Sequence, residues 1–318
     1  LSRLPGCLIH VYVVGCAFFA AISGSSAATV ATVGKMSIPE LRKRNYPEKL
    51  ILGSLAGSGT LGLLIPPSSI LIIYGVTVQE SIAKLFIAGI IPGIMLAIFF
   101  MLYVIGWSML NKNSMPKMDE TFSFSQKIKQ SGQLIPVIVL IVAVIGSIYV
   151  GIATATEAAS LGVVGALILS LFQKSLNKET FKLSLLGATK TSCMIAFILA
   201  GSAFLSLAMG FTGLPRNLAI WINEMGLSPY VLIMVLTLFY IILGMFLDGI
   251  SAVVLTMAII EPMIRQAGFD MIWFGIFLVI VVEMAQITPP VGFNLFVLQG
   301  MANKDMGFIA KSAFPLFL

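Results

Sequence analysis

The sequence predicts an all-α polytopic membrane protein made of inverted structural repeats, each with a re-entrant helical hairpin and a broken transmembrane helix. Hydrophobic residues make up 58% of the 318 residues and charged residues only 10%, whereas soluble domains contain about 25% charged residues. Two apolar stretches, 52–75 and 283–300, each contain a Pro-Pro pair near the middle. The prolines of the two halves also keep one register along the chain.

The first Pro-Pro pair, Pro66-Pro67, must interrupt its helix because proline has no amide hydrogen and its ring clashes with the preceding turn. A break inside a bilayer leaves backbone groups that lipid cannot satisfy. Broken helices therefore line cavities, and secondary transporters build binding sites from them. A simple proline kink is the alternative interpretation of this pair by itself.

A second copy of the pattern favours the break over the kink. One constant offset relates four prolines of the first half to four of the second, namely Pro39 to Pro262, Pro66-Pro67 to Pro289-Pro290 and Pro92 to Pro315. Self-similarity at a fixed spacing is typical of an internal repeat. The two halves are thus expected to share one fold.

Residues 8–33 could form one ordinary span, but the cluster Ser23–Thr29 in its middle is typical of a turn. A split there leaves arms at about 8–22 and 27–38, each shorter than the ~20 residues that cross a bilayer. We therefore expect a re-entrant hairpin over 8–38. A broken helix (47–76) and a span (84–110) complete a first repeat, 1–110.

The middle of the chain is expected to hold a polar cytoplasmic connector and a group of scaffold and arm helices. The connector, 111–130, is predicted to be amphipathic, and the helices of 131–212 are expected at 133–150, 156–173 and 183–211. Thr154–Glu157 matches a Thr-x-x-Glu capping box. This structural role is preferred for Glu157 over a functional one.

The second repeat, 213–318, restates the first. Its hairpin, 229–262, has arms at 229–246 and 252–262 around the polar tip Phe246–Ser251. A broken helix (271–299) and a span (306–318) follow. Because the chain starts at Leu1 directly in apolar sequence, further N-terminal helices are expected to be missing.

Basic residues support this topology through the positive-inside rule. With both hairpins re-entrant, the repeats are inverted and only Lys84, Arg216 and Arg265 lie outside. If residues 8–33 instead formed one full span, Arg3 alone would lie on the wrong side of the membrane. The distribution of basic residues therefore supports the hairpin only weakly. The basic residues lie in short loops between apolar spans, as membrane topology requires. We therefore expect no nucleic-acid binding.

Cysteine and histidine chemistry is not expected, because Cys7, Cys16 and Cys193 form no paired spacing and His10 is the single histidine. A hydrolase would need a positioned base, and an intramembrane metalloprotease a His-Glu motif. The chain is therefore not expected to be an enzyme.

Polar residues of the tips and breaks are expected to meet near the bilayer centre. Free amides at half-helix N-termini attract anions, and unwound carbonyls and hydroxyls suit sodium. Asp248 is a functional-site hypothesis by default, with a merely hydrated side chain as the alternative. Glu283 and Gln286 share a helix face, and inter-helix hydrogen bonding is preferred for them over a ligand role.

These residues resemble the large membrane subunit of tripartite ATP-independent periplasmic (TRAP) transporters. The motifs are SGSSAAT at 23–29, LGLLIPPSSI at 61–70, GIATATEAAS at 151–160, GMFLD at 244–248 and ITPPVGFNLFV at 287–297. Ala155 stands where this family is expected to have proline. The tip and the LAGSGTLGLLIPP run look nearest to the sialic-acid branch.

The resemblance implies an elevator-type secondary transporter in the bacterial inner membrane. It would import an organic acid, delivered by a periplasmic solute-binding protein, with Na+ as coupling ion and no organic cofactor. A small membrane subunit, separate or fused, would complete the scaffold. The alternatives are a stand-alone sodium/carboxylate symporter and a non-transporting assembly subunit.

The resemblance also implies site residues. One sodium site would use Ser25, Ser26, Gly57, Ser58 and Gly59. A second would use Asp248, Gly249, Ser251, Ala285 and Thr288. The solute would contact Ser23, Ser25, Asp248 and Arg216.

Overall fold

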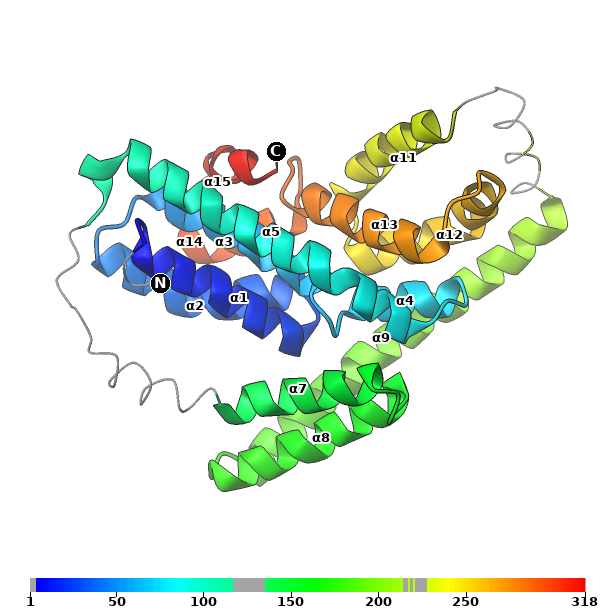
Figure 1. Ribbon diagram of the computed structural model, residues 1–318, viewed down its shortest axis with the longest axis horizontal. Coiled ribbons are helices and arrows are strands. Elements are labelled where there is room, and N and C mark those ends of the chain that lie inside the picture. The colour runs from blue at the N-terminus through cyan, green and yellow to red at the C-terminus, as the bar shows by residue number, and fades with distance from the viewer. Residues whose placement is uncertain (1–3, 117–134, 214–216, 218–219, 221–227, 318) are drawn as a thin grey trace. The chain divides into compact units, whose positions relative to one another are not determined.

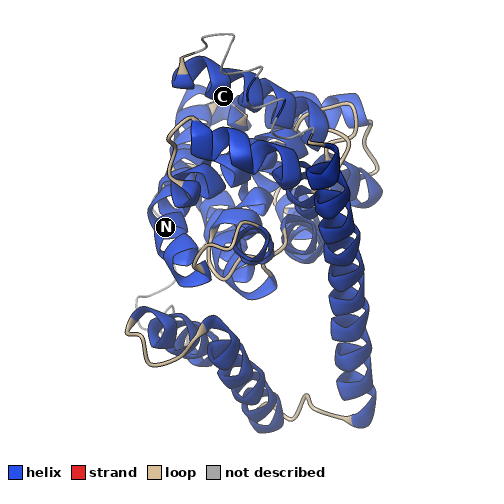
Figure 2. Cartoon of the chain, turned by 90° about the vertical axis from the view of Figure 1, so that its right-hand side faces the viewer, coloured by secondary structure: helices blue, strands red, loops and turns tan. Residues whose placement is uncertain are grey.

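The computed structural model describes residues 4–116, 135–213, 217, 220 and 228–317. Within these ranges the regular structure is entirely helical (Figures 1 and 2). The chain divides into two compact units, a larger one of Leu1–Asp119 with Thr212–Leu318 and a smaller one of Glu120–Phe211. The larger unit contains the tips and breaks singled out in the sequence.

The first hairpin consists of α1 (Cys7–Ser23) and α2 (Ser26–Lys43), which pack against each other (Figure 1). Gly24 ends α1 with a left-handed φ of 58°, a conformation that glycine adopts without steric cost. Ser25 then caps α2 by accepting a hydrogen bond from the Ala28 amide. The predicted turn is confirmed, and residues 8–33 do not form one continuous helix.

The first broken helix consists of α3 (Glu48–Leu64) and α4 (Ser69–Thr77), bent by 40°. The break contains the Pro66-Pro67 pair, whose peptide bond is cis. Every residue from Leu50 to Leu64 is buried, so α3 is the central helix of the larger unit. Its glycines permit close packing, because a Cβ on Gly59 would lie 2.0 Å from Val30 Cγ2.

Two further helical elements complete the first half. The long helix α5 (Ile82–Leu110) covers the span expected at 84–110 and packs on α3. The 3-10 helix η1 (Lys112–Ser114) follows it. The rest of the predicted amphipathic connector, from residue 117 to 130, lies outside the described residues.

The second half has the same order of elements. A helix pair, a broken helix and a terminal helix follow one another, with a cis peptide bond again between Pro289 and Pro290. These elements are α11 (Pro229–Gly244), α12 (Gly249–Gln266), α13 (Met271–Gln286), α14 (Phe293–Ala302), α15 (Met306–Ala313) and the 3-10 helix η2 (Phe314–Leu316). The tip predicted at Phe246–Ser251 and the break predicted within 271–299 are thus confirmed as helix interruptions, which the structure places at 245–248 and 287–292.

The smaller unit contains α7 (Ile135–Tyr149), α8 (Ala155–Phe172) and α9 (Lys178–Thr212), and α7 packs against α8. The capping box predicted before α8 is confirmed. The Thr154 amide donates to Glu157 Oε2 at 2.8 Å, and the Glu157 amide donates to Thr154 Oγ1 at 3.3 Å. Glu157 therefore has the structural role preferred from its sequence context.

Four helices of the described chain are long and apolar enough to cross a membrane, namely α5, α8, α9 and α12, and the bent pair α3–α4 gives a fifth candidate. This number of apolar spans indicates a multi-pass membrane protein. Helix α12 has 18 residues and is longer than the return arm expected at 252–262. Its length alone therefore fits either a span or an arm.

Candidate functional site

The first hairpin tip lies on the break of the first broken helix. The Ser69 amide at the start of α4 donates a hydrogen bond to the Gly24 carbonyl oxygen at 3.3 Å. Position 24 favours glycine, since the Cβ of any other residue would lie 3.0 Å from the Pro67 carbonyl oxygen. The turn after α1 is thereby held against the start of α4.

The second hairpin tip lies on the break of the second broken helix in the same way. The Gly292 amide, just before α14, donates to the Met245 carbonyl oxygen at 3.1 Å. A Cβ on Gly244 would lie 2.6 Å from the Ala285 Cβ atom. In both halves one backbone hydrogen bond therefore joins tip and break.

Two contacts then join the halves. Ser26 Oγ at the first tip donates to Gln286 Oε1 at the second break, at 2.5 Å. Gly249 at the second tip approaches the first broken helix, because a Cβ there would lie 2.9 Å from Ile70 Cδ1. We call the meeting point of these segments the central junction. It comprises 24–26, 67–70, 245–249 and 286–292.

Four helices begin at the central junction. They are α2, α4, α12 and α14, whose N-cap residues are Ser25, Ser68, Asp248 and Gly292. A helix N-terminus carries unsatisfied amides and a partial positive charge of about half a unit. Such ends form anion-binding sites. The Asp248 carboxylate occupies the end of α12, so the ends of α2, α4 and α14 provide the environment suited to an acidic solute.

The carboxylate of Asp248 is engaged by the first turn of its own helix. It accepts hydrogen bonds from the Ile250 amide at 3.1 Å, from the Ser251 amide at 3.3 Å and from Ser251 Oγ at 2.5 Å. Asp248 is half-buried. These contacts identify it as the N-cap of α12, a role that differs from the ligand role predicted for it.

The predicted residues of the first tip lie together. Ser23 Oγ is 3.0 Å from Thr29 Oγ1 and donates to the Ser25 carbonyl oxygen at 3.2 Å. Thr29 Oγ1 donates to the same carbonyl at 2.8 Å. Gly62 of α3 also faces it, since a Cβ there would lie 2.8 Å from Ser25 O. Thr29 and Gly62 belong to the motifs at 23–29 and 61–70 but were left out of the predicted binding sets.

Three predicted sodium residues of α3 have packing roles. A Cβ on Gly57 would lie 3.2 Å from Leu316 and 3.4 Å from Phe100, Ser58 Oγ donates to Cys16 Sγ at 3.3 Å, and Gly59 faces Val30. The side-chain faces of these residues therefore point at neighbouring helices. Their spacing in the Gly-Ser-Gly run is explained by close helix packing.

The second predicted sodium set clusters around the second tip and break. Ala285 packs on Gly244, and Thr288 Oγ1 donates to the Met284 carbonyl oxygen at 2.7 Å. Gly249 and Ser251 lie in the first turn of α12 beside Asp248. Arg216, proposed for the solute carboxylate, lies outside the described residues.

Gln286 and Glu283 were expected to share one role, inter-helix hydrogen bonding, but they have different surroundings in the structure. Gln286 makes the expected inter-helix hydrogen bond, to Ser26. Both carboxyl oxygens of Glu283 are buried without a hydrogen-bond partner in the described part of the chain. Inter-helix hydrogen bonding is therefore confirmed for Gln286, whereas the Glu283 carboxyl lies against the Leu64 backbone of α3.

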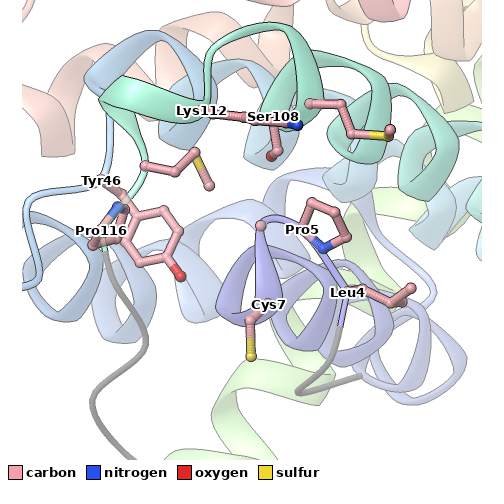
Figure 3. A pocket seen from close by; sticks show the side chains of 10 residues that line it. Leu4, Pro5, Cys7, Tyr46, Ser108, Lys112 and Pro116 are labelled. Carbon is pink, nitrogen blue, oxygen red and sulfur yellow. The ribbon is translucent and has the colours of Figure 1, made fainter.

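A pocket of about 380 Å³ lies elsewhere, at the start of α1 and the end of α5. Pro5, Cys7, Tyr46, Ser108 and Lys112 line it (Figure 3). Tyr46 follows α2 and Cys7 begins α1, so this pocket also shows that the end of α2 returns to the start of α1. None of the predicted binding residues lines it.

Comparisons with known proteins agree with the motifs quoted above. The family model "Tripartite ATP-independent periplasmic transporter, DctM component" matches residues 1–318. The C4-dicarboxylate TRAP transporter large permease protein DctM of Pseudomonas aeruginosa is 32% identical over 316 residues, covering 99% of this chain and 73% of the relative.

Two further relatives carry other names. The 2,3-diketo-L-gulonate TRAP transporter large permease protein YiaN of Escherichia coli is 31% identical, over 100% of this chain and 74% of its own length. The isethionate TRAP transporter permease protein DctMQ of Oleidesulfovibrio alaskensis is 32% identical, over 99% of this chain and 50% of its own length. These names give no specific support to a sialic-acid branch.

Proposed function

Because the chain belongs to the family of DctM components of tripartite ATP-independent periplasmic transporters, we propose that it imports a small organic acid across the bacterial inner membrane together with sodium. As a permease of this family it is not an enzyme. The observation that carries the proposal is the convergence of four helix N-termini at the central junction.

The proposed solute is an organic anion of low molecular mass. Positive helix ends favour a carboxylate or another acidic group. The hydroxyls of Ser23 and Ser25 at the first tip offer hydrogen bonds to the rest of the solute, and Arg216 is proposed as a further contact for its carboxylate. The relatives are named for C4-dicarboxylates, 2,3-diketo-L-gulonate and isethionate, which supports this class of solute.

Sodium is proposed to bind beside the solute at each tip. Oxygen ligands from carbonyls and hydroxyls suit a hard cation, and the described residues contain no group of three His, Cys, Asp or Glu side chains that would hold a transition metal. The first set is Ser25, Ser26, Gly57, Ser58 and Gly59, and the second is Asp248, Gly249, Ser251, Ala285 and Thr288. The second set is favoured over the first, because its residues lie together around the second tip and the second break.

The proposed mechanism is an elevator of inverted repeats. Residues 1–110 and 213–318 would form the two repeats, with re-entrant hairpins at 8–38 and 229–262. Residues 131–212 would contribute to the scaffold. The repeated order of elements and the matching contacts between tip and break support this division.

Two protein partners are proposed from the family, a small membrane subunit and a periplasmic solute-binding protein. A tripartite system requires components beside the large permease. This chain covers half of the relative named DctMQ, which supports a small subunit that can also be fused to the large one.

Uptake in proteoliposomes tests the proposal. The complete permease is reconstituted with its small subunit, and a panel of labelled dicarboxylates, sugar acids and sulfonates is offered with and without a sodium gradient and the solute-binding protein. We expect uptake of one acid, and we expect this uptake to require both the sodium gradient and the solute-binding protein. Uptake without the binding protein would indicate a stand-alone symporter, and absence of uptake across the panel would indicate an assembly subunit.

A further inference from the structure

Two arginines occupy equivalent positions in the two hairpins, outside the proposed solute and sodium sites. Arg42 lies in the last turn of α2, and Arg265 lies in the last turn of α12. The offset between them is the offset that relates the prolines of the two halves. Both helices have 18 residues, so the two arginines lie equally far along their helices from the central junction.

Each arginine binds the end of a helix that belongs to the other half. Arg42 Nη2 donates a hydrogen bond to the carbonyl oxygen of Ala302, the last residue of α14, at 2.7 Å. Arg265 Nη2 donates to the carbonyl oxygen of Val78, the C-cap of α4, at 3.1 Å. Ala302 and Val78 are both buried, at 2% and 1% exposure. Two equivalent contacts between the halves therefore satisfy the C-terminal ends of α14 and α4.

A guanidinium group suits these helix ends. The last carbonyl groups of a helix lack partners within the helix and carry a partial negative charge, which a cation stabilises. Each arginine also binds a carboxylate, since its planar fork holds several N–H donors. Arg42 pairs with Glu48 at the start of α3. Arg265 pairs with Glu261 at 2.9 Å, and Glu80 lies 3.8 Å from it. The carboxylates thus help to fix each guanidinium at the helix end that it caps.

The capped helices and the arms that cap them all begin at the central junction. Helix α2 packs against α14, and α12 packs against α4. In each pair the two helices therefore run in the same direction, with like ends together. This arrangement of dipoles is electrostatically unfavourable, and a cation at the C-terminal ends offsets it. Because α4 and α14 have only 9 and 10 residues, a displacement of the capped end also moves the end at the junction.

We propose that Arg42 and Arg265 are positioning residues of the solute site, which hold the N-termini of α14 and α4 at the central junction. Each arginine belongs to one half and fixes the anion-binding helix of the other half. Loss of the contact leaves the carbonyl group of a buried residue without this partner, and the short helix is then free to shift away from the solute. The effect on the solute rests on the proposed function, whereas the contacts between the halves do not.

Hydrogen–deuterium exchange of the complete permease tests the positioning role and needs no transport. We expect Arg42→Gln to speed amide exchange at least about threefold in α14 and Arg265→Gln to do so in α4, with the other short helix unchanged in each variant. Arg44→Gln is the matched control, because Arg44 lies at the same end of α2 and pairs at 2.6 Å with Glu40 of its own helix. It should leave exchange in α14 unchanged.

The conservative variants Arg42→Lys and Arg265→Lys keep the charge without the planar fork. We expect each to speed exchange in the same helix as the Gln variant, but by a smaller factor, and they decide the question where a Gln variant does not fold. Faster exchange confined to the half that carries the substitution, or equally faster exchange in α4 and α14, would overturn the proposal.

Uptake by the same variants is the second measurement. We expect Arg42→Gln and Arg265→Gln each to lower the initial uptake rate at least about fivefold, the Lys variants to recover part of the rate, and Arg44→Gln to keep it. Wild-type rates in both Gln variants would overturn the link between these arginines and the solute site. If the wild type takes up no acid at all, the proposed function fails, and the exchange result still decides whether the arginines position α14 and α4.

Discussion

The two hairpin tips share one backbone contact and differ in turn conformation and chemistry. In each tip a backbone carbonyl oxygen accepts a hydrogen bond from the break of its own half: Gly24 accepts from the Ser69 amide, and Met245 accepts from the Gly292 amide. The first tip is uncharged and turns through a left-handed glycine, whereas the second turns without one and starts its return helix with the carboxylate of Asp248. The two tips therefore have one backbone contact in common, while their turns and side chains differ.

The tips also differ in what they pack against, and this difference gives the largest expected effect. Gly62→Ala would place a Cβ 2.8 Å from the backbone of Ser25, which cannot move without shifting the first tip. Gly249→Ala would meet the ends of the Ile70 and Val282 side chains, which can rotate. We expect Gly62→Ala to destabilise the fold by about 1–3 kcal/mol and Gly249→Ala by clearly less. Equal thermal unfolding shifts of the two purified variants would contradict this difference.

The two tips are also expected to differ in how much stability their helix caps lose on substitution. Ser25→Ala removes the cap of α2 and should cost about 1 kcal/mol, whereas Asp248→Asn keeps a capping oxygen for α12 and should change stability by only a few tenths of a kcal/mol. Chemical unfolding monitored by circular dichroism would measure both. A larger loss for Asp248→Asn would mean that the charge itself stabilises the second tip.

The hydrogen bond between Ser26 and Gln286, which joins the two halves, is expected to be worth about 0.5–1.5 kcal/mol. Ser26→Ala, Gln286→Ala and the double variant form a cycle that isolates the bond between these side chains. Additive unfolding free energies would show that the first tip and the second break are not energetically linked. The bond would then be dispensable for the central junction.

The smallest effect is expected within the second hairpin. Tyr240→Phe removes the 2.7 Å hydrogen bond between α11 and α12, but Thr256 keeps its bond to the Ala252 carbonyl. The expected loss of stability is therefore about 0.5 kcal/mol. Thermal unfolding checks it, and a loss of several kcal/mol would show that this bond fixes the arms of the hairpin.

The sequence predicted those features that local chemistry controls. Pro66-Pro67 and Pro289-Pro290 end helices because proline cannot continue them, and Ser25 follows Gly24 in a pattern suited to a turn and cap. The bond of Ser26 to Gln286 joins residues far apart in the chain. Only tertiary packing reveals such a contact, although the shared offset of the prolines already indicated which segments are equivalent.

The predicted roles of the polar and small residues share one physical difficulty. Glycine and serine serve close helix packing as well as ligand binding, and in the Gly57–Gly59 run the neighbours Leu316, Cys16 and Val30 account for the side-chain positions. Carboxylates raise the same difficulty. Asp248 caps a helix while Glu283 remains without a partner in the described residues, and composition alone does not separate these environments.

Uptake by site variants tests the central claim that the two tips form one solute and ion site. Wild type, Ser25→Ala, Asp248→Asn and the packing control Tyr240→Phe are reconstituted at equal amounts with the solute-binding protein and a sodium gradient. We predict that Ser25→Ala and Asp248→Asn each lower the initial uptake rate at least about tenfold while remaining folded, and that Tyr240→Phe keeps it. Undiminished uptake in both tip variants would contradict the assignment of the central junction as the transport site.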